Sequence, residues 1–494
     1  MTNTYSSPFI SELYFMRQML RAGLVIVLWL GVGHASANTL PSIANHQSYL
    51  ISQSEEHHIG QLVAGNLNRA PTSKALAIRL WLTDLVRPLL NHSSLSDKQL
   101  QIFLVNNKSI NAFAAPGGVI GVHTGLILQT RQVDELVAVL AHEIAHISQR
   151  HYAHRLANEK SKAPIYFGAF LASMALATQV DVDLGEAGLH ATQAALIRDK
   201  MGYSRAHEQE ADRVGLALMQ AAGFDVNKML SMLNLLDSPF VEQDPNWAWS
   251  RSHPISEERV ADLASRIEQL PAHKSSEHYQ MDFQLLRLML ATELNDATKQ
   301  SLSSISQQLD PLDDKYALYQ QFATAMVHLQ QQHWHAAAQM LAPLAELYPT
   351  QAFIWDRWMQ ALLAQGNNQA VITYAQEYVK LGFHRSLAYY YLARASAAQD
   401  DMHSAYRYLD KLMLAQPLWI GGWEMLAQWS GQAADLSTHR VAMAQWHLLR
   451  SEFEQAKEQA LLGQQLATTS DAQRQQLADI LNTAKTLTAT AARL

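Results

Sequence analysis

The sequence contains no cysteine among its 494 residues. It can therefore form no disulfide, no thiolate nucleophile and no cysteine-ligated zinc site, and any metal must be bound by histidine or carboxylate side chains. Charged residues are also sparse, at 16%, and 37 basic residues are outnumbered by 44 acidic ones. The net charge of −7 leaves no basic excess for binding phosphate backbones, which argues against a nucleic-acid partner.

Uninterrupted apolar runs are short. Near the N-terminus, two arginines precede the apolar residues 22–33, a run of about 12 residues where a membrane-spanning helix needs roughly 20, and small residues follow up to Ala37. This pattern predicts a secretory signal over residues 1–37, cleaved near Ala37, rather than a retained membrane anchor. Met16 is an alternative start to Met1, because the stretch before it is long for the charged part of such a signal.

A second uncharged apolar stretch covers residues 163–177 and is also too short to span a bilayer. Its pattern predicts a helix buried in the protein. A helix that is apolar on every side can also lie against lipid, so peripheral membrane contact or gating of substrate entry is the alternative.

Helical periodicity dominates the rest of the first half. Hydrophobic residues make up 48% of the chain, enough to form two or three packed units at this length. Apolar residues recur every three or four positions in 54–87, from 133 to about 154 and from about 187 to 222, which predicts helices. Residues 101–106 and the glycine-rich residues 113–127 predict strands. The predicted fold class is therefore α+β and mostly helical.

From residue 313 onward, strand signals become sparse, and alanine, leucine and aromatic residues recur at helical spacing. Ala337, Ala370 and Ala405 follow one another at steps of 33 and 35 residues, the period of a helix-hairpin repeat. This pattern resembles degenerate tetratricopeptide repeats and predicts an α-solenoid over residues 313–494, preceded by a helical linker at 273–312. Such solenoids bind partners on a concave face. The alternatives are an unrelated helical bundle and a packed spacer.

The segment His142-Glu143-Ile144-Ala145-His146 lies in one of the predicted helices. Its two histidines lie about 40° apart around the helix and one turn from each other, so both imidazoles can bind one metal ion. Glu143 lies beside that metal, where a base for its water belongs. Two histidines and one further ligand on zinc leave a position for a water of increased acidity, which suits peptide hydrolysis. The alternative is a surface helix with two solvated histidines.

A third metal ligand must come from another segment, and residues 204–212 (SRAHEQEAD) are the candidate. By chemistry alone, Glu208, Glu210 and His207 could each bind a metal. Glu208 and Asp212 share one helical phase, one turn apart, which the two rival ligands do not share.

H-E-x-x-H followed some 60 residues later by S-R-x-x-E-x-E-A-D resembles the zinc peptidase family that contains the HtpX heat-shock protease and the prenylated-protein endopeptidase. The resemblance implies a zincin-type metallopeptidase domain of the gluzincin kind over residues 38–272. It implies one Zn²⁺ per chain, bound by His142, His146 and Glu208. Asp212 is then a catalytic-site residue that supports the ligands or handles protons.

Residues 111–126 resemble the family's edge strand, which pairs with an extended substrate through main-chain hydrogen bonds. The residues expected to contact substrate there are Gly117, Gly118 and Val119. A purely structural hairpin is an equal alternative.

His253 and Pro254, with Arg259, resemble the family's H-P-x-x-x-x-R segment. His253 is a regulatory candidate: as a fourth ligand it would displace water and latch the enzyme in an inactive state. The alternatives are a donor that stabilises the transition state and a histidine that only packs the loop. Other histidines, His151 among them, are expected to be solvated or core residues, because none has a histidine partner four residues away in a buried run.

Signal, peptidase body and repeats together are similar to periplasmic members of this family. The resemblance implies a periplasmic protease and chaperone that degrades unfolded or stalled outer-membrane β-barrel proteins and contacts the barrel assembly machinery through its repeats. The rival function is a catalytically idle scaffold or chaperone with a structural zinc. A structural zinc site has four protein ligands and needs no base, so Glu143 favours the enzyme.

Overall fold

The computed structural model of the protein describes most of the chain from residue 51 to residue 493. The described residues are 51–70, 72, 74–158, 203–236, 249, 252–271, 277–293, 309 and 311–493. The predicted secretory signal and the apolar stretch at 163–177 lie outside them, as does the first part of the helix expected from about 187. Within these ranges, no helix is both long enough and apolar enough to cross a bilayer.

A three-stranded sheet lies in the first part of the chain. β1 (Gln101–Val105), β3 (Val119–His123) and β2 (Ala112–Ala115) lie side by side in that order, with β1 parallel and β2 antiparallel to β3. In the turn between β2 and β3, Gly117 and Gly118 have φ angles of 73° and 78°, which glycine adopts without strain. Among the described residues, no strand pairs with the outer side of β2.

Helices cover both faces of this sheet because successive strand residues point to opposite sides. One face packs against α3 (Leu76–His92) and α5 (Val133–Ser148) through Ile102, Leu104, Ile120 and Val122. The other face packs against α2 (Gln53–Arg69) through Phe103, Val105, Ala115 and Val119. The sheet is therefore enclosed, and its β2 edge remains for other contacts.

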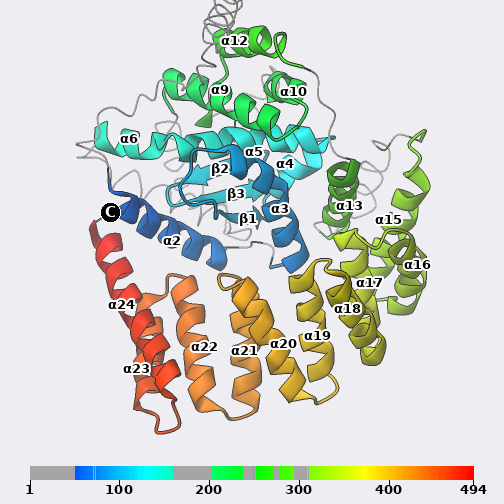
Figure 1. The fold of residues 1–494 in the computed structure, drawn as a ribbon, viewed down its shortest axis with the longest axis vertical. Coiled ribbons are helices and arrows are strands. Elements are labelled where there is room, and N and C mark those ends of the chain that lie inside the picture. Colours follow the sequence, from blue (N-terminus) through cyan, green and yellow to red (C-terminus); the bar gives the residue numbers. More distant parts are fainter. Residues whose placement is uncertain are drawn as a thin grey trace, which may run out of the picture. The chain divides into compact units, whose positions relative to one another are not determined.

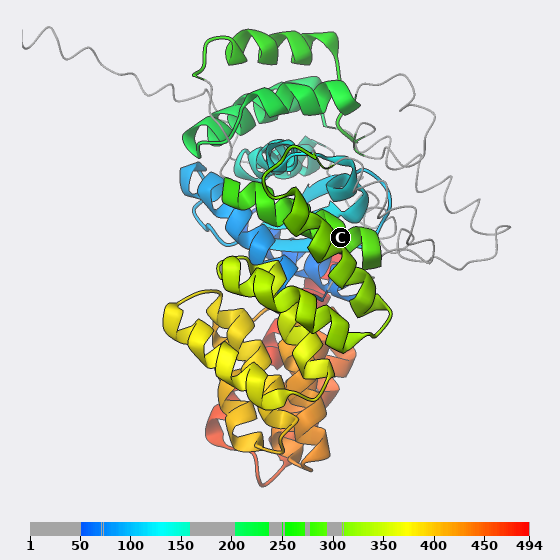
Figure 2. The same cartoon turned by 90° about the vertical axis from the view of Figure 1, so that its right-hand side faces the viewer.

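α5 is the central helix of this part, and all its residues from Val133 to His146 except Glu135 are buried. Figures 1 and 2 show it between the sheet and α9 (Arg205–Ala221), which packs along it. A Cβ atom added to Gly215 of α9 would lie 3.2 Å from the backbone nitrogen of His142. Glycine at this position therefore lets the two helices approach closely. Further helices among the described residues of this part include α4 (Thr124–Gln129), α10 (Asn227–Leu236), α12 (Glu257–Ile267) and α13 (Glu277–Glu293).

The helix expected from 133 to about 154 is interrupted. α5 ends at Ser148, and α6 (His151–Asn158) begins after Arg150, whose φ of 54° lies in the left-handed region. The Arg150 guanidinium holds this bend, because its Nε donates to Glu56 Oε2 at 2.9 Å and its Nη2 to the Ile51 carbonyl at 2.6 Å. Hydrophobic periodicity could not reveal this bend, since both helices keep an apolar face.

The last part of the chain consists of helices that pack in sequence order, as Figure 1 shows. They are α15 (Tyr316–Gln330), α16 (Trp334–Leu347), α17 (Ala352–Ala364), α18 (Asn368–Leu381), α19 (Arg385–Ala397), α20 (Met402–Ala415), α21 (Ile420–Gln432), α22 (Leu436–Leu449), α23 (Phe453–Gln465) and α24 (Asp471–Arg493). Ala337 and Ala405, two of the alanines that define the predicted repeat, are fully buried. Ala370, the third of them, is only partly buried, and the repeat period stays a prediction.

Several polar contacts join these helices to the first part of the chain. The Trp419 indole Nε1–H donates to the Lys74 carbonyl at 3.1 Å, and the Lys74 ammonium lies 3.0 Å from the Glu424 carboxylate. The Asn68 side-chain amide donates to the Leu449 carbonyl at 2.8 Å. The C-terminal helices and the sheet-containing part therefore share an interface.

Candidate active site

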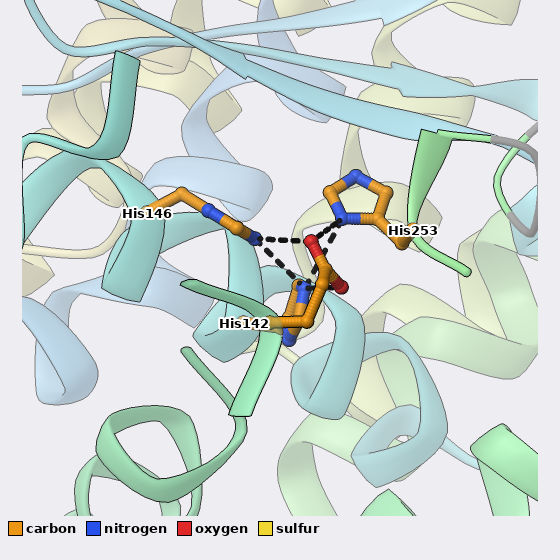
Figure 3. Close-up of side chains that lie close together, drawn as sticks. His142, His146 and His253 are labelled. Atoms are coloured by element: carbon orange, nitrogen blue, oxygen red, sulfur yellow. Dashed lines mark hydrogen bonds and ion pairs between the residues drawn. The ribbon is translucent and has the colours of Figure 1, made fainter. Parts of the chain in front are cut away.

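His142 and His146 project from adjacent turns of α5 toward one point (Figure 3). Their Nε2 atoms lie 3.0 Å apart, and each residue is only 2% exposed. The helical spacing of H-E-x-x-H therefore brings the two imidazoles together as the sequence predicts.

α9 supplies the carboxylate that faces the two histidines. Glu208 places Oε1 3.4 Å from His146 Nε2 and Oε2 3.4 Å from His142 Nε2. The helix begins at Arg205, after Ser204 accepts a hydrogen bond from the His207 backbone, which places Glu208 in the first turn. Of the three candidate ligands in this segment, only Glu208 reaches the paired histidines.

The side chains of His207 and Glu210 lie beside His151 instead. The His207 ring stacks on the His151 ring with 4.4 Å between centroids. Glu210 Oε2 lies 3.2 Å from His151 Nε2. The helical phase that separates these two residues from Glu208 therefore directs them to a different neighbour.

His253 completes a group of four. Its Nδ1 lies 3.1 Å from Glu208 Oε1 and 3.2 Å from His142 Nε2, and the donor atoms of His142, His146, Glu208 and His253 all lie within 4.8 Å of one another. Its backbone N–H donates to the Trp249 carbonyl at 2.9 Å, and its ring stacks on the Trp249 indole. The loop that carries the H-P-x-x-x-x-R segment thus brings a third imidazole to the site.

These donor atoms fit a zinc ion. Ligands about 2.1 Å from a tetrahedral zinc lie roughly 3.4 Å from one another, close to the 3.0 to 3.4 Å between the pairs above. Burial raises the pKa of Glu208, but the three imidazoles hold it well below its usual value, so the carboxylate is ionised. Three imidazole nitrogens and a carboxylate that converge in a buried position are a ligand set for a divalent cation.

The two α5 histidines differ electrostatically. Burial lowers the pKa of His146 to about 3, which keeps its ring neutral. Burial acts on His142 in the same direction, but hydrogen bonds to Asp212 and Glu208 raise its pKa to about 9. Glu208 lies on the Nε2 side, where it would also stabilise a metal cation, whereas Asp212 lies at Nδ1 on the opposite side of the ring.

Glu143 lies beside the ligand group and is fully buried. Its Oε1 accepts a hydrogen bond from the Trp249 indole N–H at 3.1 Å and lies 3.4 Å from His253 Nε2. Its Oε2 has no hydrogen-bond partner among the described residues. One carboxylate oxygen is therefore held in place, and the other is available to a proton near the ligands.

Asp212 faces His142 from behind. Its Oδ1 lies 3.0 Å from His142 Nδ1, and the Arg259 guanidinium donates to both of its oxygens, from Nε at 2.7 Å and from Nη2 at 2.9 Å. The same guanidinium lies 2.9 Å from Glu208 Oε2 and donates to the Pro254 carbonyl at 2.7 Å. Asp212 thus orients the His142 ring, and Arg259 ties the His253 loop to both carboxylates.

The three residues expected to contact substrate lie at different places in the sheet. Gly117 and Gly118 form the turn after β2, and Val119 begins β3, whose two edges are already paired with β1 and β2. Among the described residues, the outer edge of β2 (Ala112–Ala115) has no strand partner and can accept another strand. A cleft of about 280 Å³ runs beside it, lined by His146, Tyr203, Glu56, His57 and residues 114–118, among others.

Sequence reasoning missed three side chains that surround the ligands. Trp249 holds Glu143 and supports His253, Tyr203 stacks on His146 with 3.9 Å between centroids, and His151 places Nδ1 2.9 Å from His146 Nδ1. Two of them could have been found from their closeness in sequence to the motifs, since Tyr203 directly precedes the S-R motif and Trp249 lies four residues before His253.

Comparison with known proteins supports this chemistry. Residues 78–267 match the model of peptidase family M48. The chain is 27% identical over 394 residues to the β-barrel assembly-enhancing protease of Yersinia pestis, which covers 79% of this chain and 80% of that protein. It is 26% identical over 425 residues to the protease of the same name from Escherichia coli (strain K12), which covers 85% of this chain and 86% of that one.

A shorter match involves the mitochondrial metalloendopeptidase OMA1 of Schizosaccharomyces pombe, with 31% identity over 181 residues, 37% of this chain and 50% of that protein. The region that matches the family model, 78–267, contains all four members of the buried metal-binding group. This region is therefore similar to M48 peptidases, and the protein is a zinc metalloendopeptidase that resembles the β-barrel assembly-enhancing proteases.

Proposed function

We propose that His142, His146 and Glu208 bind the catalytic zinc and that Glu143 is the general base for peptide hydrolysis. The observation that carries this proposal is the convergence of three ligand atoms next to a buried carboxylate with one unpartnered oxygen. When bound, zinc supplies a Lewis acid that polarises the scissile carbonyl and acidifies a water molecule. Glu143 Oε2 accepts the proton of that water and delivers it to the leaving amine, while the Trp249 indole fixes the other oxygen.

The substrate lies as an extended chain along β2. His123 donates its backbone N–H to the Asn111 carbonyl, so in this antiparallel ladder Phe113 and Ala115 also pair with β3, and the backbone groups of Ala112 and Ala114 face the free edge. Those groups can pair with a substrate backbone whatever its side chains. This mode of binding suits a protease that cleaves unfolded proteins of varied sequence.

His253 is proposed to latch the site. Its Nδ1 occupies the place where a fourth ligand would lie, and a fourth protein ligand would exclude the water and the substrate carbonyl. Because a loop carries His253, the imidazole can withdraw when substrate enters the cleft. A fully closed four-ligand site would also suit a structural zinc, but Glu143 has no task in such a site.

The proposed substrates are unfolded or stalled outer-membrane β-barrel proteins. Support comes from the two relatives above, each named β-barrel assembly-enhancing protease and each matched over most of its length. The proposal includes export to the periplasm with cleavage near Ala37, a peptidase domain at 38–272, a linker at 273–312, and tetratricopeptide-like repeats at 313–494. The repeats would contact the barrel assembly machinery and give the protein a chaperone activity beside its protease activity.

The test uses the zinc-loaded mature chain with an unfolded outer-membrane β-barrel protein and the same protein folded in detergent. Cleavage of the unfolded form alone, abolished by a chelator and restored by zinc, is the expected result. If zinc binds stoichiometrically but neither form is cleaved, also after His253 is replaced by alanine, the scaffold with a structural zinc is the better function.

A further inference from the structure

His151 is a buried histidine that the zinc ligand set does not use. Its side chain is 1% exposed, its Nδ1 lies 2.9 Å from Nδ1 of His146, and its Nε2 lies 3.2 Å from Glu210 Oε2. A continuous helix would place His151 about 140° around the axis from His146, on another face. The bend at Arg150 brings it back behind the ligand.

The contacts of Arg150 and His207 fix the position of this ring. Arg150 is anchored by two hydrogen bonds, to Glu56 of α2 and to the carbonyl of Ile51, two residues before that helix. The His207 imidazole stacks nearly parallel on the His151 ring, at 15° and 4.4 Å. The backbone next to His151 and one face of its ring are therefore both fixed, which gives the ring a defined orientation.

The direction of the hydrogen bonds from His146 through His151 to Glu210 follows from which nitrogen of His146 would bind the metal. His146 points Nε2 at His142 and Glu208, so a metal-bound neutral ring carries its proton on Nδ1. That N–H donates to His151 Nδ1, which as an acceptor leaves the His151 proton on Nε2. The Nε2–H then donates to the Glu210 carboxylate.

We propose that His151 and Glu210 are positioning residues for the zinc site, which fix the tautomer and orientation of His146. The other histidine ligand has the same support in a shorter form, since His142 Nδ1 contacts the Asp212 carboxylate directly. Each ligand imidazole therefore ends on a carboxylate, one directly and one through a second histidine. Such outer contacts of metal-bound histidines raise ligand basicity and fix ring orientation.

The inference rests on the proposed ligand set and is tested by metal affinity as well as activity. The variant His151→Phe keeps the ring volume and removes the acceptor, and His151→Asn keeps an acceptor near the Nδ1 position. Glu210→Ala removes the terminal carboxylate at a half-buried position, where loss of folding is not expected. His92→Phe, at an exposed histidine that ends α3 and lies outside this set of contacts, is the matched control. Zinc affinity is measured by chelator competition, and ligand geometry by the visible spectrum of the Co²⁺-substituted protein.

We expect His151→Phe to weaken zinc binding by about 10- to 100-fold, the usual effect of losing such a contact. Its Co²⁺ spectrum should change, and kcat should fall more than KM rises. His151→Asn should lie closer to the unmodified protein, Glu210→Ala should weaken zinc binding by several-fold, and His92→Phe should change nothing. Unchanged zinc affinity and an unchanged Co²⁺ spectrum in both His151→Phe and Glu210→Ala would overturn the inference. If His151→Phe does not fold, Glu210→Ala and His151→Asn decide it.

A wrong assignment of the zinc ligands would give a different result in the same zinc-affinity measurements. Should His146→Ala retain zinc with full affinity, the proposed ligands are wrong whatever the His151 variants show. Zinc loss in His146→Ala together with normal affinity in the His151 and Glu210 variants would reject the positioning role alone.

Discussion

Glu208 and Glu210 lie two positions apart on α9 and have different partners. Glu208 faces the three imidazoles, whereas Glu210 contacts His151 from the side. At saturating zinc, Glu208→Gln should therefore lose bound metal and activity, because a neutral amide is a poor zinc ligand. Glu210→Gln keeps an oxygen that accepts from His151 and should retain one zinc per chain. Metal analysis of the two purified variants makes the comparison, and the reverse stoichiometries would contradict the ligand set.

A single substitution of His253 distinguishes among the three roles considered for it: latch, transition-state donor and packing residue. Its imidazole reaches the ligand group from a loop. If it latches the site, His253→Ala should increase cleavage of an unfolded substrate by several-fold while zinc stays bound, because a coordination position becomes free. Initial rates at equal zinc content provide the measurement. A collapse of activity with zinc retained would instead show a transition-state donor, and an unchanged rate would leave only packing.

At the scale of elements, the free edge of β2 carries a prediction about substrate. Ala114 lines the cleft and directs its backbone N–H outward. Ala114→Pro removes that donor without breaking a ladder hydrogen bond to β3, so cleavage should fall by about 10-fold or more, chiefly through KM. Ala114→Thr, which keeps the N–H and favours a strand, is the matched control. Equal KM values for the two variants would exclude pairing at this edge.

The sequence predicted the helices and strands better than the bends and loops that connect them. The spacing of H-E-x-x-H fixes His142 and His146 because helical geometry is local, and the S-R-x-x-E-x-E-A-D motif indicated Glu208. The bend at Arg150 depends on a hydrogen bond to Glu56, 94 residues away, and the contribution of Trp249 depends on a loop that packs on α5. Contacts between residues so distant along the chain leave no periodic signal.

The substrate strand illustrates the same limit. The glycine-rich segment forms paired strands as expected, with Gly117 and Gly118 in the turn between them, but the pattern did not show that Val119 begins the central strand of the sheet. Strand order is set by which strands pack on α2, α3 and α5, information that a single hairpin pattern does not contain. Gly117 and Gly118 line the same cleft as Ala114 of β2, and the contact of any of these residues with substrate stays a prediction.

At the scale of the whole molecule, one buried carboxyl should make stability depend on pH. Asp134, near the start of α5, is fully buried, and burial raises its pKa to about 6. In the unfolded chain the group ionises near its ordinary value of 3.8. The loss in free energy of unfolding caused by burying this carboxyl therefore grows as pH rises from about 4 through 6, and it is present in full at neutral pH.

Asp134→Asn removes that cost and keeps an oxygen that accepts from the Asp225 backbone. It should raise the free energy of unfolding by about 1–3 kcal/mol at pH 7.5 and by much less at pH 4. Urea unfolding of both proteins at the two pH values makes the measurement. A gain that is larger at pH 4 than at pH 7.5 would have the wrong sign for this account.

The most direct test of the central claim is the rate of peptide cleavage by Glu143→Gln, measured together with its zinc content. The substitution preserves side-chain size, all proposed zinc ligands and an oxygen for the Trp249 indole, but the amide cannot accept the proton of the attacking water. Glu258→Gln, which changes an exposed carboxylate on α12, is the matched control. We predict one zinc per chain in both variants, with cleavage reduced about 100-fold or more in Glu143→Gln alone. Cleavage by Glu143→Gln at the unmodified rate would contradict the account.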